Sequence, residues 1–262
     1  MSYQTLKVRF EESSTAQGKE DICFIQLYRP EANNTINDQL IDECRQVLGI
    51  CHDNVKLVVL EGLPEVFCFG ADFKGMADQT SQAEPTQSQP EPAYDLWTQL
   101  AKGPYVTVAH VRGKTNAGGM GFVAACDIVL ADSQAEFSLS ELLFGLMPAC
   151  VLPFLIRRIG FQKAHSLTLM TKPIAVKDAH QWGLVDAYAD DSQALLRQHL
   201  LRLKRLNKTA ITRYKSYINK LDDYLATSKP KALAANLEVF SDQENLAKIT
   251  RYVKMGQFPW ET

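Results

Sequence analysis

The most informative stretch of this 262-residue chain is Thr115-Asn-Ala-Gly-Gly-Met-Gly-Phe-Val-Ala-Ala-Cys126. It reads as a turn of small residues that opens an apolar helix, and a second turn of the same kind, Phe67-Cys-Phe-Gly-Ala-Asp72, precedes it. The first N–H groups of a helix have no partner within the helix, and Gly or Ala side chains do not shield them. Because such donors suit a carbonyl oxygen that gains negative charge, the two turns predict an oxyanion site.

A third stretch, Ser138-Leu-Ser-Glu-Leu-Leu-Phe-Gly145, contains the leading catalytic candidate, Glu141. Leucine and phenylalanine neighbours surround it, and a carboxyl group in apolar surroundings has a raised pKa, which suits proton transfer near neutral pH. Two structural interpretations stay open beside this one. Glu141 could cap the helix that follows, or it could pair with Arg157 or Arg158.

The pattern of apolar residues predicts an α/β fold in which a β-β-α order repeats. We expect strands at residues 5–10, 22–27, 55–61, 105–111, 128–131 and 135–138. We expect helices at residues 38–51, 94–101, 119–126, 152–159, 163–170, 176–182, 192–225 and 232–252. Because helical periodicity dominates the second half, we divide the chain into a catalytic core at residues 1–195 and a C-terminal helical region at residues 196–262.

The segment between Met76 and Tyr94 is rich in Gln, Ser, Thr, Glu and Pro and contains few apolar residues. A segment of this composition cannot bury itself, so we expect it to be mobile. Two interpretations are equally open for residues 77–93. They form either a lid that orders around substrate or a tolerated surface insertion.

The composition is that of an ordinary globular protein, with 46% hydrophobic and 22% charged residues. A formal net charge of -2 argues against a nucleic-acid-binding role. The six cysteines include no Cys-x-x-Cys pair, and the chain contains neither a signal-peptide pattern nor an apolar run of membrane-spanning length. We therefore expect a cytoplasmic protein that binds neither nucleic acid nor a membrane.

Motifs for common cofactors fail on their spacing. Arg112-Gly-Lys-Thr115 resembles the end of a P-loop, but Val108 stands where that motif requires glycine. Residues 116–121 lack the G-x-G-x-x-G spacing of dinucleotide sites, and the five histidines are scattered. No G-x-S-x-G elbow surrounds the serines near Glu141. The sequence thus predicts neither a cofactor nor a metal.

Four motifs in the same order resemble those of the crotonase (enoyl-CoA hydratase/isomerase) superfamily and span nearly the whole chain, at residues 27–37, 69–74, 112–127 and 137–148. The resemblance implies a crotonase-like spiral of β-β-α repeats with a C-terminal α-helical trimerisation region, assembled as a homotrimer or a dimer of trimers. It also implies an acyl thioester whose carbonyl lies between the N–H groups of Ala71 and Gly118. The substrate-binding positions implied around these donors are Gly70, Phe73, Gly119, Gly121 and Pro148.

The sequence departs from the hydratases of this superfamily at one position. Those enzymes carry two glutamates, of which the second maps onto Glu141 and the first onto Gly121. Water addition to a simple enoyl thioester normally uses one acid to orient water and another to move the Cα proton. The glycine therefore argues against ordinary hydratase activity, and we expect it to leave room near Cβ for a larger, branched substrate.

A closer resemblance, over residues 30–38, 67–73, 114–122 and 137–150, is to the dehydratases of bacterial polyketide β-branching cassettes. It implies removal of water from a 3-hydroxy-3-methylglutaryl group on an acyl carrier protein, which gives a 3-methylglutaconyl thioester. Glu141 would remove the Cα proton and return it to the departing hydroxyl, as one carboxylate can when the two atoms are neighbours. Asp72 is a weaker helper candidate, since it could equally cap the helix after its turn.

Three other functions stay open. A decarboxylase of the 3-methylglutaconyl product needs an oxyanion site but no Cα base, and Lys74 or Lys114 could hold its substrate carboxylate. An isomerase needs a single glutamate that moves a proton between Cα and Cγ. A non-catalytic binding protein of the same fold would have lost half of its acid pair.

A basic helical stretch offers a docking surface for an acidic carrier protein, although a solvated helix face is the simpler explanation. Its basic residues are Arg202, Lys204, Arg205, Lys208, Arg213 and Lys215. We prefer a carrier-bound thioester to free coenzyme A as the substrate.

Overall fold

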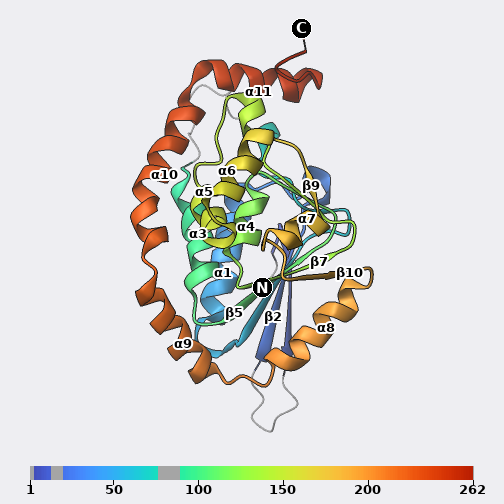
Figure 1. Cartoon of the computed structure of the whole chain (residues 1–262), viewed down its shortest axis with the longest axis vertical. Helices are drawn as coiled ribbons and strands as arrows, with labels where there is room; N and C mark the ends of the chain where they lie inside the picture. The colour runs from blue at the N-terminus through green and yellow to red at the C-terminus, as the bar shows by residue number, and fades with distance from the viewer. Residues whose placement is uncertain (1–2, 13–19, 76–88, 262) are drawn as a thin grey trace.

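The structure, a computed structural model, describes residues 3–12, 20–75 and 89–261 (Figure 1). Its larger sheet has six strands in the order β1-β2-β3-β5-β7-β10. The first pair, β1 (Leu6–Glu12) and β2 (Glu20–Leu27), is antiparallel. The remaining strands run parallel to β2, and they are β3 (Leu57–Glu61), β5 (Val106–Val111), β7 (Ile128–Asp132) and β10 (Ala187–Ala189).

A smaller sheet has four short strands in the order β4-β6-β8-β9. These strands are β4 (Val66–Cys68), β6 (Lys114–Asn116), β8 (Glu136–Ser138) and β9 (Ile174–Ala175). The strands β4, β6 and β8 each follow a strand of the large sheet and pair with one another in parallel. The expected β-β-α repeat is thereby confirmed.

Side chains of the central strand β3 alternate between two hydrophobic cores, as the two-residue period of a strand requires. Val58 and Leu60 pack into the larger core, whereas Leu57 and Val59 face the opposite way, toward α8 (Ser192–Leu203). Figure 1 shows the corresponding layers, with α8 on one side of the sheet and the other helices across from it. The larger core is covered by α1 (Asp38–Asn54), α3 (Glu91–Lys102), α4 (Gly119–Ala125) and α5 (Leu152–Ile159).

The parallel pairing of the short strands brings three sequence motifs to one edge. Thr115 pairs with Cys68 on one side and with Phe137 on the other. Each strand ends within a few residues of the motif that follows it. Because parallel strands present their carboxyl ends at the same edge, the motifs also meet at one edge. The two small-residue turns and the Glu141 segment, η2 (Glu141–Phe144), therefore lie together.

The C-terminal region contains more helices than the sequence predicted. The expected single helix at residues 192–225 is wrong, because Asn207 caps a new helix by accepting a hydrogen bond from the Ala210 amide. The expected helix at residues 232–252 is also wrong, because Asp242 caps another helix in the same way through Glu244. The helices after α8 are α9 (Lys208–Leu221), α10 (Tyr224–Ser241) and α11 (Gln243–Met255), which run along the outer edge and tip of the molecule (Figure 1).

Most other expected elements occur with ends shifted by up to three residues, and the helix at residues 152–159 matches α5 in full. The sequence missed the short strands β4, β6, β9 and β10, which are too brief to show a period. It also missed η1 (Pro30–Ala32). The predicted helix at residues 163–170 is two residues shorter than α6 (Phe161–Met170), and the one at residues 176–182 is one residue longer than α7 (Val176–Gln181). The proposed division after residue 195 falls inside α8 and stays a prediction. Within the described ranges, no helix is long and apolar enough to cross a membrane.

Candidate active site

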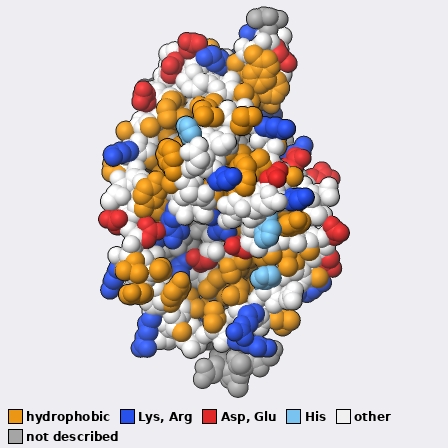
Figure 2. All heavy atoms as spheres, in the orientation of Figure 1, with side chains coloured by type: hydrophobic (Ala, Val, Ile, Leu, Met, Phe, Trp, Pro, Cys, Tyr) orange, Lys and Arg blue, Asp and Glu red, His pale blue; other side chains and the backbone are white. Residues whose placement is uncertain are grey.

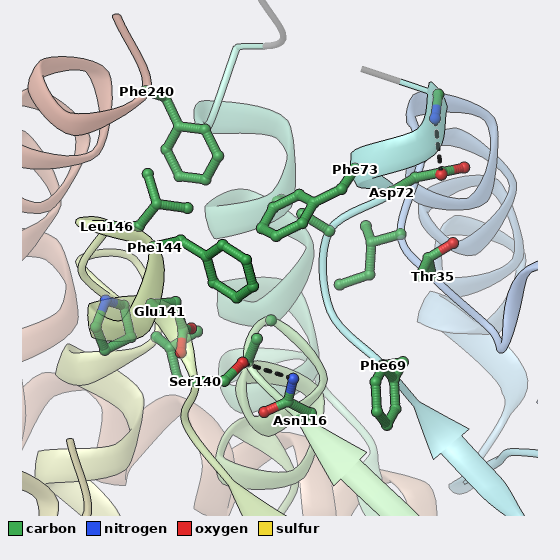
Figure 3. Close-up of a pocket in the computed structure, with 18 of the residues that line it drawn as sticks. Thr35, Phe69, Asp72, Phe73, Asn116, Ser140, Glu141, Phe144, Leu146 and Phe240 are labelled. Atoms are coloured by element: carbon green, nitrogen blue, oxygen red, sulfur yellow. Dashed lines mark hydrogen bonds between the residues drawn. The ribbon is translucent and has the colours of Figure 1, made fainter. Parts of the chain in front are cut away.

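A cavity of about 1350 Å³ opens at the edge where the three motifs meet (Figure 3). Its walls come from the turns after β4 and β6, from the η2 segment, and from the helices α10 and α11. Figure 3 shows Glu141 and Ser140 at one side of the cavity, with Phe73 and Phe144 above them and Asp72 at the opposite side. The cavity is therefore built by both the sheet region and the C-terminal helices.

The two small-residue turns lie against each other. A Cβ atom built on Gly70, whose φ is +89°, would stand 2.7 Å from the Ala117 Cβ and 3.2 Å from the Gly118 nitrogen. A Cβ built on Gly118 would stand 3.9 Å from the Ala71 nitrogen. Only glycine at position 70 permits this approach and this φ. The amide nitrogens of Ala71 and Gly118 are thus brought close together.

Both of these amide groups are available to a ligand. Ile36 donates to the Gly70 carbonyl at 2.7 Å and accepts from the Asp72 amide at 3.1 Å. Successive N–H groups of an extended chain point to opposite sides, so the Ala71 amide points away from Ile36. No hydrogen bond between described residues uses the N–H of Ala71 or Gly118. Two such donors can stabilise a developing oxyanion.

Glycine is required at position 119 for a different structural reason. A Cβ built on it would stand 2.4 Å from the Cys68 carbonyl oxygen, so glycine lets α4 begin directly against β4. Ala117 has a φ of +51°, an uncommon value for alanine, immediately before the Gly118 amide. Such a conformation persists only where the surrounding packing holds it, as the contact with Gly70 does here.

Glu141 is buried, and its Oε2 atom has no hydrogen-bond partner among the described residues. Burial raises the pKa of its carboxyl group to about 7, and hydrogen bonds from the backbone amides of Glu141 and Ser140 offset part of that rise. A carboxyl group with this pKa can accept and return a proton near neutral pH. The proposed ion pairs do not form, because Arg157 pairs with Asp222 and Arg158 with Asp186.

A chain of polar side chains holds the Glu141 segment in place. Ser138 donates to the Asn116 Oδ1 at 2.8 Å, and the Asn116 amide donates to the Ser140 Oγ at 2.9 Å (Figure 3). These bonds join the ends of β6 and β8 directly before η2. They limit the positions that Glu141 can take relative to Gly118.

Asp72 uses both of its carboxylate oxygens within the protein. Oδ1 accepts from the Gly75 amide at 3.0 Å, and Oδ2 accepts from the Arg29 guanidinium at 2.8 Å. Arg29 in turn donates to the Thr35 carbonyl at 2.6 Å. Of the two roles considered for Asp72, this geometry matches the helix cap.

The space beside Gly121 is filled, which contradicts the expectation that this glycine leaves room for a branched substrate. A Cβ built on Gly121 would stand 2.5 Å from the Trp97 Cε2 and 2.6 Å from its Cζ2. Trp97 belongs to α3, lines the cavity and is only 4% exposed. The indole therefore occupies the place of a side chain at position 121.

Aromatic side chains surround the outer part of the cavity. The Phe73 ring meets the Phe144 ring edge to face at 5.7 Å, and Phe144 meets Tyr252 at 5.1 Å. The tilted ring of Phe258 lies 4.9 Å from that of Tyr252, and Pro148 also lines the cavity. The contribution of α11 and the C-terminal segment was missed, because aromatic residues near a terminus carry no signal of where they fold back.

Two residues of the expected docking surface are not free. Lys208 donates to the Val55 and Pro104 carbonyls at 2.8 and 2.7 Å, and Lys215 is buried against Asp127 at 2.5 Å. Their assignment to a docking surface is therefore wrong, since they join α9 to the core. On the face drawn in Figure 2, basic and acidic side chains are interspersed.

Several other expectations concern the cysteines and the polar segment. The six cysteines are free and buried, as expected for small apolar residues. Residues 77–88 of the expected lid lie outside the described residues, and the end of that segment belongs to α3, which begins at Glu91.

Comparisons with known proteins agree with this geometry. The model of the enoyl-CoA hydratase/isomerase family matches residues 17–262. The chain is 59% identical to the bacillaene synthase dehydratase PksH of Bacillus subtilis over 262 residues, which cover 100% of this chain and 98% of the relative. It is 35% identical to the mitochondrial enoyl-CoA hydratase of Pongo abelii, over 64% of this chain and 58% of that protein.

Solved structures extend the similarity to the whole fold. The crystal structure of pksH from Bacillus subtilis, a polyketide biosynthesis enoyl-CoA hydratase by description, superposes with a TM-score of 0.93 and covers 98% of this chain and 100% of that one. An enoyl-CoA hydratase/isomerase from Xanthobacter autotrophicus Py2 superposes with a TM-score of 0.84 at 20% identity, over 97% and 95% of the two chains. At that identity the second match concerns the fold alone.

Proposed function

Because the chain belongs to the enoyl-CoA hydratase/isomerase family, the crotonase superfamily, we propose that it is a dehydratase of acyl thioesters in polyketide β-branching. The proposed substrate is a 3-hydroxy-3-methylglutaryl group on an acyl carrier protein, and the product is the 3-methylglutaconyl thioester. One observation carries the proposal. Glu141, a buried carboxyl group whose Oε2 has no hydrogen-bond partner among the described residues, lines the same cavity as Ala71 and Gly118. Trp97, rather than an acid, fills the space beside Gly121.

The reaction begins at the thioester carbonyl. Its oxygen accepts hydrogen bonds from the Ala71 and Gly118 amides, and Glu141 takes the Cα proton. The electron pair of the broken C–H bond forms an enolate, whose charge the two donors stabilise by about 3 kcal/mol each. The enolate then expels the β-hydroxyl, which leaves as water with the proton that Glu141 returns. No external acid, oxidant or reductant is needed.

The cavity supports a substrate that is longer than its acyl group. Its volume of about 1350 Å³ exceeds the roughly 300–1,000 Å³ typical of small-molecule sites. The aromatic residues around Phe144 would line the path of the pantetheine arm, which is common to coenzyme A and to carrier proteins. We assign the carrier form because the relative with 59% identity is described as part of bacillaene synthase.

A direct product analysis tests the proposal. The purified protein is incubated with the 3-hydroxy-3-methylglutaryl form of an acyl carrier protein, and the intact mass of the carrier is measured. Loss of one water supports the dehydratase. Loss of carbon dioxide from the 3-methylglutaconyl carrier identifies the decarboxylase instead, and an unchanged mass on both substrates, with the carrier bound, favours the non-catalytic function.

For the decarboxylase, the structure separates the two lysines considered. Lys74 is among the described residues that line the cavity, and Lys114 is not. A decarboxylase would use Lys74 to hold the substrate carboxylate. Decarboxylation that is lost in Lys74→Ala and kept in Lys114→Ala would support that function over dehydration.

We also propose that the C-terminal helices form the contacts of a homotrimer. Three large side chains on one side of α9 are exposed by more than half, namely Tyr214 (62%), Tyr217 (61%) and Leu221 (64%). Their spacing places them on neighbouring turns of the helix. Light scattering should give a trimer or its multiple for the wild type and a smaller species for Tyr217→Glu.

A further inference from the structure

Trp97 lines the cavity and fills the space beside Gly121, and it carries a hydrogen-bond donor rather than an acid. We propose that Trp97 is a catalytic residue whose indole Nε1–H donates a hydrogen bond to the β-hydroxyl that leaves during dehydration. The inference rests on the proposed function, and it names a group that binds the departing oxygen.

The indole is held in one orientation by its neighbours. It meets the Phe122 ring edge to face at 6.0 Å and the Phe154 ring edge to face at 5.9 Å. Gly121 lies directly against its Cε2 atom, the ring carbon bonded to Nε1. Any larger residue at position 121 would displace the ring. The Trp97 ring of α3 thus fills the space that a side chain at position 121 of α4 would occupy, so the two residues depend on each other.

The Nε1–H group of this indole is unused among the residues that the structure describes. It is buried and has no hydrogen-bond partner among the described residues. Buried indole N–H groups usually find a partner, so an orphan donor beside a cavity calls for an explanation. Trp97 lines the cavity that also contains Glu141, whose Oε2 is likewise without a partner. Since each lacks a partner, the two groups are not bonded to each other.

The chemistry of the donor selects the atom that it binds. A single neutral N–H group suits a neutral oxygen, whereas a carboxylate in this apolar wall would need several donors or a cation to offset its lost hydration. The substrate has one neutral oxygen besides the thioester carbonyl, which is its β-hydroxyl. The carboxylate of the substrate is thus excluded from the Trp97 side of the cavity.

A donor at this position assists departure of the hydroxyl. As the Cβ–O bond breaks, the electron pair stays on oxygen, and the hydrogen bond from Nε1–H strengthens with the growing negative charge. Glu141 supplies the proton that completes the water molecule, while Trp97 keeps its own proton. The hydrogen bond therefore acts mainly in the transition state and affects kcat more than KM.

The first experiment replaces the donor and keeps a ring. Trp97→Phe removes the N–H group and retains an aromatic side chain against Gly121. We expect kcat for dehydration of the 3-hydroxy-3-methylglutaryl carrier to fall by about 10–100-fold, with KM within about threefold. Trp182→Phe, the same substitution at a partly buried residue of the α7 end, is the matched control and should keep the wild-type rate.

A second measurement separates chemistry from packing. Exchange of the Cα proton with deuterated water on a 3-methylglutaryl carrier, which lacks the hydroxyl, requires Glu141 and the two backbone donors but no leaving-group donor. Trp97→Phe should exchange within about twofold of the wild type, while Glu141→Gln should lose both exchange and dehydration. An equal loss of exchange and dehydration in Trp97→Phe would show that the indole only packs, and would overturn the inference.

The remaining outcomes distinguish the inference from the proposed function. Undiminished dehydration by Trp97→Phe overturns the inference alone and leaves the dehydratase in place. If the wild type exchanges the Cα proton but dehydrates no 3-hydroxyacyl carrier, the proposed function fails and the role of Trp97 fails with it. Circular dichroism and chemical denaturation of each variant show that the measured protein is folded.

Discussion

Two walls of the same cavity carry different polar groups, a carboxyl group on one and an indole N–H group on the other. The η2 wall carries Glu141, a buried carboxyl group with a pKa of about 7, directly after Ser140, whose hydroxyl accepts a hydrogen bond from Asn116. The other wall carries Trp97 of α3, whose indole fills the space beside Gly121. The first wall can move a proton, and the second offers only a hydrogen-bond donor.

The absence of an acid at position 121 does not leave an empty space in the core. Removing a side chain from a packed helix invites a neighbour to fill the gap, because voids in protein interiors are costly. Here the neighbour is the largest side chain available, and its ring makes glycine necessary at position 121. The walls therefore differ in charge, but both are tightly packed.

The largest effect is expected from the η2 wall. Glu141→Gln removes the only proposed proton carrier and should lower kcat for dehydration by about 10²–10⁴-fold, the range for general acid–base groups. Rates are measured by intact mass of the carrier over time. Glu136→Gln, an exposed glutamate on β8, is the control and should keep the wild-type rate. Near-normal turnover by Glu141→Gln would contradict the proposed mechanism.

The same wall should make the fold less stable as the pH rises from 4.5 to about 7. The pKa of Glu141 is raised from 4.5 to about 7, so the carboxyl group favours the native state below pH 4.5 and loses this advantage as the pH rises through 7. The raised pKa corresponds to at most about 3 kcal/mol of stability lost by pH 8. Chemical denaturation should therefore show Glu141→Gln gaining stability over the wild type between pH 5 and pH 8. A constant difference would contradict the raised pKa.

The free energy of unfolding should respond to a single methyl group added beside Trp97. Gly121→Ala places a Cβ against the Trp97 ring and should lower the free energy of unfolding by about 1–3 kcal/mol, as overpacking does. The control is Gly49→Ala in α1, where nothing lies within 4 Å of the added Cβ. That variant should gain up to about 1 kcal/mol from helix propensity. Equal stabilities of the two variants, measured by denaturation, would show that the indole yields easily.

The rate of the reaction should also depend on pH through Glu141. Dehydration requires ionised Glu141, so kcat/KM should rise about tenfold per pH unit below pH 7 and level off above it. The rate is measured from pH 5.5 to 8.5 on the carrier substrate. The Trp97→Phe variant should show the same profile at a lower rate, because the indole does not titrate. A rate that falls between pH 6 and pH 8 would contradict the role of Glu141 as base.

Local patterns were enough for several elements. The helix α5 was predicted with its ends from the apolar pattern alone. In the structure Pro153 lies in its first turn and Gly160 follows its last residue, so both limits are set within the segment itself. The break at Asn207 was missed, since the capping hydrogen bond competes with an otherwise continuous helical pattern. The same competition at Asp242 divides α10 from α11.

The candidate site divides in the same way. The apolar neighbours of Glu141 in the sequence already indicated a raised pKa, and the motif resemblance pointed to Ala71 and Gly118. For Asp72 the sequence left two roles open, a catalytic helper and a helix cap. In the structure its carboxylate accepts hydrogen bonds from both Gly75 and Arg29. Its bond to Arg29, which lies 43 positions away, carried no local signal.

The segments that carry chemistry could be predicted from the sequence, because small-residue turns and a glutamate among leucines are properties of neighbouring residues. The groups that meet across the cavity depend on the tertiary structure. Parallel pairing of β4, β6 and β8 set the two amides beside the Glu141 segment, and packing of α3 on α4 placed Trp97 over Gly121. Such contacts join residues far apart in the chain, and they depend on the shape of the whole core rather than on any local preference.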